Sequence, residues 1–517
     1  MEMFIKIGML VAFFSVMVGI GLYCRKHSTD VNGFVLGGRN VGPWLTAFAY
    51  GTSYFSAVVF VGYAGQFGWK YGIAATWAGV GNAFLGSLLA WYILGRRTRI
   101  ITQHLDSATM PQFFESRFDS EKLKLAASAI IFVFLIPYTA SLYNGLSRLF
   151  SMAFNIDYSV CVIVMAVLTG IYVIAGGYMA TAINDFIQGL IMIVGIIAVI
   201  SAVLKGFGGF EGAIEELSKV SDPAVSDVPG IFASLFGPDP VNLLGVVLLT
   251  SLGTWGLPQM VQKFYAIKNE KSINKGMIIS TVFALIVAGG CYFLGGFGRL
   301  FSDKVNVAKE GYDAIIPTML SDLSPFLIAV VVILVLSASM STLSSLVLTS
   351  SSTLTLDFIK GKIVKNMKEK TQLTIMRILI VVFIAISVII AIIQYRSNVT
   401  FIAQLMGVSW GALAGAFLAP FLYGLYSKKI TAASVWVNFI FSTAVMLLNT
   451  VAKDYFPVIL RSPINAGAFC MIAGLIIVPI VSLFTKAPSK EHIDKVFSCY
   501  DRKVTVSVTD SIGEISE

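Results

Sequence analysis

The sequence predicts an all-α polytopic membrane protein. The 517 residues are 56% hydrophobic and only 13% charged, whereas soluble domains carry about 25% charged residues. Apolar runs recur from the N-terminus to about residue 485, and a run of about 18 residues or more can cross a hydrocarbon core as a helix. Because the runs are continuous rather than alternating, helices are expected in place of barrel strands.

About 13 membrane-spanning helices are expected from the apolar runs. They lie near 4–24, 44–67, 71–95, 123–153, 157–178, 183–204, 240–262, 276–300, 324–356, 372–394, 399–425, 430–450 and 464–485. The first run lacks the basic start and small-residue cleavage site of a signal peptide, so it is interpreted as a retained helix. Residues 1–485 then form one transmembrane domain, and the polar residues 486–517 form a tail.

Basic residues gather in the connections that follow odd-numbered helices. One such group is Lys263, Lys268, Lys271 and Lys275, assigned to the loop after the seventh helix. The positive-inside rule therefore places the N-terminus outside and the C-terminal tail in the cytoplasm of a plasma (inner) membrane. The net charge of +9 is explained by these loops, so no nucleic-acid partner is expected. The five cysteines are scattered and are expected to be free thiols.

Two of the expected helices are interrupted by small residues, near 50–56 and 250–258. Glycine and proline weaken a helix, and proline removes a backbone donor. The interrupted segments occupy matching places in two halves, about 44–204 and 240–425, which run through the membrane in opposite senses. Paired broken helices in inverted repeats indicate a transporter site. Ordinary helix packing through Gly and Ser is the alternative.

Oxygen-bearing residues could hold a cation between the first interrupted helix and the ninth. Ser341, Ser344 and Ser345 share one helix face, and an unwound segment could add the carbonyls of Thr52 and Phe55. Hydroxyls that bond back to their own helix are the alternative. Asp185 is a second candidate, because an acidic group at membrane depth is costly. An aspartate stabilised at a helix N-terminus is the competing interpretation.

Polar and aromatic residues in the interruptions and in the fourth and eleventh helices are the candidates for a solute pocket, although such side chains also serve in packing and interface belts. They are Ser53, Tyr54, Ser56, Tyr138, Tyr143, Asn144, Trp255, Gln259 and Gln404. The sequence shows no Walker-type loop, and its three histidines have no metal-ligand spacing. We therefore do not expect an enzyme.

Four sequence strings resemble the sodium–solute symporter family, most closely its sodium–proline and sodium–pantothenate members. The strings are GGRNVGPW at 37–44, GTSYFSA at 51–57, ATAINDFIQG at 180–189 and SMSTLSS at 339–345, and the likeness extends over about 4–485. It implies a LeuT-type core of two inverted five-helix repeats, with one helix before it and two after, and alternating access driven by Na⁺.

The resemblance also implies ion-binding residues. The common sodium site of the family falls on the carbonyls of Thr52, Phe55 and Ala338 and the hydroxyls of Ser341 and Thr342. Some members hold another sodium ion, and the corresponding residues here are Asp185, Ser341, Ser344 and Ser345. The number of sodium ions per cycle, one or two, stays open.

The solute pocket departs from that of the proline members. Tyr54 stands where they have an aspartate, and Thr250 and Thr254 stand where they have a tryptophan and a tyrosine. We expect a monomeric, Na⁺-coupled symporter in the lipid bilayer that imports a small carboxylate-bearing solute: an amino acid such as proline, or a monocarboxylate or pantothenate-like acid. A sodium-independent channel or facilitator, a proton-coupled symporter and a transporter-like sensor are the alternatives.

Overall fold

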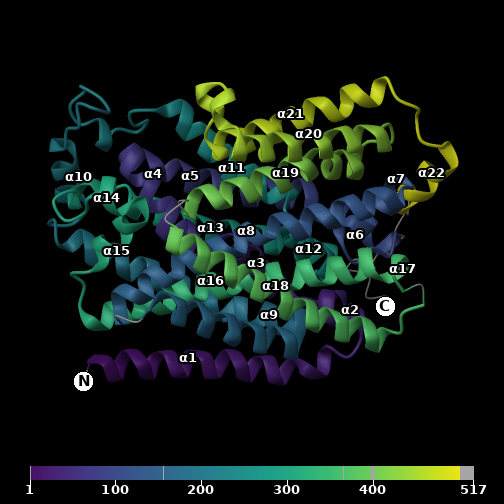
Figure 1. The fold of residues 1–517 in the computed structure, drawn as a ribbon, viewed down its shortest axis with the longest axis horizontal. Helices are drawn as coiled ribbons and strands as arrows, with labels where there is room; N and C mark the ends of the chain where they lie inside the picture. The colour runs from purple at the N-terminus through teal and green to yellow at the C-terminus, as the bar shows by residue number, and fades with distance from the viewer. Residues whose placement is uncertain (1, 155–156, 365, 398–401, 501–517) are drawn as a thin grey trace, which may run out of the picture.

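The structure, a computed structural model, describes residues 2–154, 157–364, 366–397 and 402–500. Within these ranges the chain is helical, and β-pairing is limited to isolated bridges. The long helices lie roughly parallel, with α1 (Glu2–Cys24) along one edge of the bundle (Figure 1). The other long helices are α8 (Glu121–Phe154), α9 (Tyr158–Lys205), α11 (Pro240–Gly256), α13 (Glu270–Gly295), α16 (Pro325–Thr353), α18 (Glu369–Ser397), α19 (Ile402–Tyr426), α20 (Ala432–Val451) and α21 (Pro463–Leu483).

The expected number of about 13 spans is not confirmed. Among the described residues, ten helices are long and apolar enough to cross a membrane, and the bent pair α11 and α12 (Pro258–Ala266) makes an eleventh. The count is lower because helical structure continues through two expected loops, giving single stretches of 47 residues at Val58–His104 and 48 residues at Tyr158–Lys205. The second stretch kinks at Gly177, where φ is 55°, a value suited to glycine.

Helices α16 and α19 form the centre of the bundle. Every residue of α16 from Leu334 to Thr353 is buried, including its run of hydroxyls, and α16 packs against α8, α9 and α18. Helix α19 is similarly enclosed, by α8, α11, α20 and α21. Because the hydroxyls of α16 face protein rather than lipid, they can build a polar site at membrane depth.

Short helices cover the two ends of the bundle. The helices α10 (Phe210–Lys219), α14 (Val307–Glu310) and α15 (Ile315–Leu320) lie at one end, and α7 (Met110–Phe118), α17 (Lys360–Lys362) and α22 (Lys490–Phe497) lie at the other (Figure 1). The end with α17 and α22 also carries α6 (Arg96–His104), which is rich in arginine. The expected basic face is therefore one end of the molecule.

The tail is partly folded onto this basic end. Helix α22 buries Ile493, Val496 and Phe497, while residues 501–517 lie outside the described residues. As expected, the five cysteines form no disulfide with one another, and all five are buried.

Candidate cation and solute site

The first interruption lies where α3 (Pro43–Tyr54) ends. Phe55 has extended dihedral angles, φ −86° and ψ 118°, and helical structure resumes in a π-helical segment, η3 (Val58–Tyr63). A helix that stops leaves the carbonyls of its last turn without helical donors. The carbonyl of Thr52 belongs to this last turn, so the interruption supplies oxygen ligands that the helix itself does not use.

The second interruption separates α11 from α12. Leu257 is extended between Gly256 and Pro258, and the two helices are bent by 46°. Proline at the first helical position loses no hydrogen bond, because that N–H has no helical partner. Glycine is required before it, since a Cβ on Gly256 would lie 2.8 Å from the Cα of Ala414 in α19.

Five oxygen atoms converge where the end of α3 meets α16. The Oγ1 of Thr342 lies 3.1 Å from the carbonyl oxygen of Thr52, 3.2 Å from that of Phe55 and 3.1 Å from that of Ala338. The Oγ of Ser341 lies 3.2 Å from the Thr52 oxygen and 3.0 Å from the Ala338 oxygen. Thus the structure brings together the five residues to which the resemblance assigns a sodium ion.

This cluster has more acceptors than donors. Each hydroxyl carries one proton, so the two hydroxyls can donate two hydrogen bonds, while the distances above describe five close approaches to carbonyl oxygens. An excess of oxygen lone pairs at membrane depth is the arrangement that a hard cation satisfies. The five oxygen atoms, all of them neutral, therefore fit Na⁺ as ligands.

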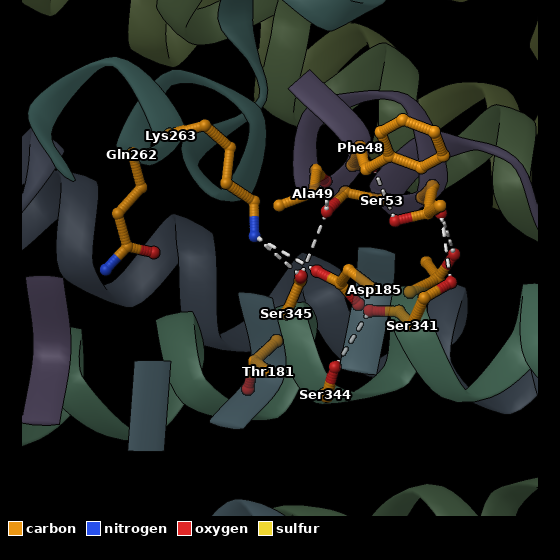
Figure 2. Close-up of polar contacts among 12 residues, drawn as sticks. Phe48, Ala49, Ser53, Thr181, Asp185, Gln262, Lys263, Ser341, Ser344 and Ser345 are labelled. Carbon is orange, nitrogen blue, oxygen red and sulfur yellow. Dashed lines mark hydrogen bonds and ion pairs between the residues drawn. The ribbon is translucent and has the colours of Figure 1, made fainter. Parts of the chain in front are cut away.

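A second polar cluster surrounds Asp185, which is fully buried in α9. The Nζ of Lys263 lies 3.9 Å from the Asp185 Oδ2 and donates a hydrogen bond of 3.0 Å to the Ser345 Oγ. The Ser345 Oγ is also 3.0 Å from the Ser53 Oγ of α3. Figure 2 shows Lys263 reaching from α12 toward Ser345 and Asp185. Lys263 of α12 thus lies between Asp185 of α9 and Ser345 of α16, and Ser345 in turn contacts Ser53 of α3.

The assignment of Lys263 to a cytoplasmic loop is wrong. Its side chain is 3% exposed, because α12 continues past the expected end at residue 262 to Ala266. Sequence reasoning counted this lysine with its basic neighbours. The inward position of Lys263 could have been predicted from its spacing to Gln259. The two residues stand four apart, on one face of the helix that follows Pro258.

The other serine assigned to a second ion has a local partner. Ser344 donates a hydrogen bond of 2.9 Å to the carbonyl oxygen of Ser341 (Figure 2), as expected for a hydroxyl that bonds back to its helix. Asp185 and Ser345 are therefore brought together with Lys263, while the hydroxyl of Ser344 is turned to its own backbone.

The solute candidates do not all face one space. Ser53 joins the Asp185 cluster through Ser345, and the side chain of Tyr54 lies outside the described residues. Trp255 donates to the carbonyl oxygen of Leu85 at 2.9 Å, so its indole packs against the preceding half of the bundle. Asn144 accepts a hydrogen bond from Tyr158.

Four other candidates remain near the interruptions or in α8. Ser56, Tyr138, Tyr143 and Gln259 are all buried, and the side-chain N and O of Gln259 have no hydrogen-bond partner among the described residues. Gln404 is half-buried near the start of α19. A buried amide without partners costs stability, which makes Gln259 the clearest candidate for contact with a solute.

Two interrupted helices whose ends meet a buried cluster of oxygen atoms are typical of one class of membrane protein, the secondary transporters. Residues 34–441 match the model of the sodium:solute symporter family, and the chain belongs to that family. It is 28% identical to the osmoregulated proline transporter OpuE of Bacillus subtilis (strain 168), over 95% of this chain and 96% of that protein. It is also 28% identical to the sodium/proline symporter of Staphylococcus aureus (strain JH9), over 82% of each chain.

Solved structures confirm the fold. The substrate-bound, outward-open state of a Na⁺-coupled sialic acid symporter aligns with a TM-score of 0.74 at 16% identity, covering 94% of this chain and 99% of that one. Mhp1, a nucleobase–cation symport transporter in a closed conformation, aligns with a TM-score of 0.51 at 13% identity, covering 89% and 97%. The LeuT-type fold expected from the sequence is therefore confirmed.

Proposed function

We propose that this protein couples the inward movement of Na⁺ to the import of a small carboxylate-bearing organic solute by alternating access. The observation that carries the proposal is the convergence of five oxygens from Thr52, Phe55, Ala338, Ser341 and Thr342. A cation there joins the end of α3 to α16 and so favours one arrangement of the two elements. Each sodium ion that enters gains about 2.3 kcal/mol per 100 mV of membrane potential.

A carboxylate fits the neighbouring space for two reasons. The N-terminus of α12 presents the positive end of a helix dipole. The buried amide of Gln259, the second residue of α12, has no partner among the described residues and can donate to an anion. The relatives named for proline transport support an amino acid such as proline. Because Tyr54, Thr250 and Thr254 depart from the pocket expected of the proline members, a monocarboxylate or a pantothenate-like acid is the second candidate.

The proposal includes a location and an architecture. The arginine-rich end with α6, α7 and α22 faces the cytoplasm of a plasma membrane, so the N-terminus lies outside. Residues about 44–204 and 240–425 form the two inverted repeats, with one interrupted helix near the start of each. One chain contains both ion ligands and solute candidates, so the functional unit is a monomer.

The test is uptake into proteoliposomes that contain the purified protein. Amino acids, monocarboxylates and pantothenate are supplied with an inward Na⁺ gradient, with a proton gradient alone, or with neither. We expect accumulation of one solute class with the Na⁺ gradient only. Uptake that persists without Na⁺ would favour a facilitator, and uptake driven by protons alone would reject sodium coupling.

Thr342→Val tests the ion ligands while preserving side-chain volume. Removal of a hydroxyl that contacts a charge costs about 1.5–3 kcal/mol, so the apparent Na⁺ affinity should fall about 10- to 100-fold. Ser352→Ala is the matched control, because Ser352 is equally buried in α16 but its hydroxyl bonds to the Thr349 carbonyl. Equal effects of the two substitutions would exclude a specific ion site at Thr342.

A further inference from the structure

A cation that belongs to the protein itself, Lys263, lies beside Asp185, the one carboxylate that the described part of the chain places next to the proposed sodium site. The ammonium of Lys263 is 3.9 Å from the Asp185 carboxylate and 3.0 Å from the Ser345 hydroxyl. Neither oxygen of Asp185 has a hydrogen-bond partner among the described residues. Lys263 is therefore the charged group that compensates Asp185 in this part of the chain.

The charges of the surrounding elements balance without a further ion. Helices α3, α12 and α16 contain one charged residue, Lys263, and α9 contains Asp185 and, at its far end, Lys205. One carboxylate and one ammonium therefore give a net charge of zero at the contact of the four helices. A second sodium ion bound at Asp185, in addition to the Na⁺ proposed at the Thr342 oxygens, would have to share this one carboxylate with the ammonium, and two cations on one buried anion are unfavourable away from water.

We propose that the Lys263 ammonium serves as a built-in cation of the Asp185 site, in place of a second sodium ion, so that the protein binds and carries one Na⁺ per cycle. This proposal rests on the sodium coupling proposed above and specifies its stoichiometry. The lysine belongs to the chain, so its charge returns with the empty carrier and adds nothing to the net charge moved.

The hydrogen bonds of Lys263 support this role. Its ammonium donates to Ser345, and Ser345 contacts Ser53, the residue that follows the ion ligand Thr52. A cation at this point links α9, α12 and α16 to the last turn of α3. A free sodium ion would need the same Ser345 and Asp185 oxygens, and it would meet the ammonium at a few ångströms with like charge.

The experiment counts sodium ions bound to the purified full-length protein by equilibrium binding of radioactive Na⁺, without any solute. The unmodified protein should bind one ion per chain with a Hill coefficient of one. Lys263→Met removes the ammonium but keeps an unbranched side chain, so the variant should bind two ions. Combination with Asp185→Asn should return the count to one, because the carboxylate that attracts the second ion is gone.

Two further variants serve as controls. Lys263→Arg keeps the charge and should bind one ion. Lys271→Met removes an exposed lysine near the start of α13 and should also bind one. Two ions in the unmodified protein, or one ion in a folded Lys263→Met variant, would overturn the proposal. If Lys263→Met does not fold, the count in the unmodified protein decides. The absence of any bound sodium would instead contradict the proposed function, so the two failures are distinguishable.

Discussion

Gln259 and Gln262 lie one helical turn apart in α12, and both amides are buried, but their surroundings differ. Gln262 donates to the carbonyl oxygen of Val35 at 3.1 Å and accepts from Thr349 at 2.9 Å. Gln259 has neither kind of partner among the described residues. A buried polar group that lacks partners lowers stability and is retained where a ligand supplies the missing hydrogen bonds.

Leucine substitutions at these two glutamines should therefore have opposite effects. Gln259→Leu removes an unpaired buried amide, so the melting temperature without solute should stay unchanged or rise, while solute affinity should fall about tenfold or more. Gln262→Leu leaves the Val35 carbonyl and the Thr349 hydroxyl without their partner and should lower the melting temperature. Thermal unfolding and solute-dependent uptake measure both effects. A loss of stability in Gln259→Leu with normal uptake would show that Gln259 is structural.

Site residues that belong to local sequence patterns could be predicted, whereas a residue whose role depends on a tertiary contact could not. Thr52, Ser341 and Thr342 could be grouped because hydroxyls spaced along an apolar helix and an interrupted partner are local patterns. Lys263 could not be placed, because a lysine at the cytoplasmic end of a span resembles a loop residue. Whether its side chain points inward depends on the length of α12 and on the distant Asp185, neither of which is a local property.

At the scale of elements, close helix contacts depend on glycine. Helix α4 (Ala64–Tyr71) meets α13 where a Cβ on Gly68 would lie 1.8 Å from the carbonyl oxygen of Gly295. A Cβ on Gly295 would lie 2.1 Å from the carbonyl oxygen of Ala64. Small residues that let two backbones touch are a common basis of helix association in membranes.

Gly68→Ala should therefore separate α4 from α13. The added methyl group meets backbone rather than a movable side chain. The free energy of unfolding should therefore fall by at least about 1–3 kcal/mol, the range typical of overpacking. We expect a lower melting temperature in detergent and a lower yield of folded protein. Gly8→Ala in α1 is the matched control, since nothing lies within 4 Å of a Cβ built there. Equal melting temperatures for the two variants would contradict the close contact.

The structure has the helices and the two interruptions that the sequence predicts, but it has fewer candidate membrane spans than expected. Both interruptions were predicted because glycine, serine and proline break an apolar helix locally. The number of spans was not predicted correctly, because helical structure continues through turns that hydropathy marks as loops, as at Tyr158–Lys205. Turn geometry such as the positive φ of Gly177 depends on the packing of Phe34 against it, which is a tertiary contact.

At the scale of the whole molecule, the C-terminal segment closes the basic end of the bundle. Arg117 of α7 is fully buried and donates to the carbonyl oxygens of Gly424 and Ser427 at the end of α19. The ring of Phe497 in α22 lies 5.0 Å from its guanidinium. Burial lowers the pKa of Arg117 to about 10, so the group stays charged at neutral pH and the cation–π contact persists.

Phe497→Ala should detach α22 from this end of the bundle. The ring is 4% exposed, and loss of a buried phenylalanine costs about 3–5 kcal/mol in well-packed cores. Since α22 follows an exposed connection, limited proteolysis should cut near residues 484–490 several-fold faster, while Na⁺ binding at the distant α3–α16 contact should not change. Phe236→Ala is the control, because this ring is 65% exposed and lies outside the cleaved segment, so its removal should leave the cleavage rate unaltered. A cleavage rate in Phe497→Ala equal to that of the control would mean that α22 contributes nothing to the folded core.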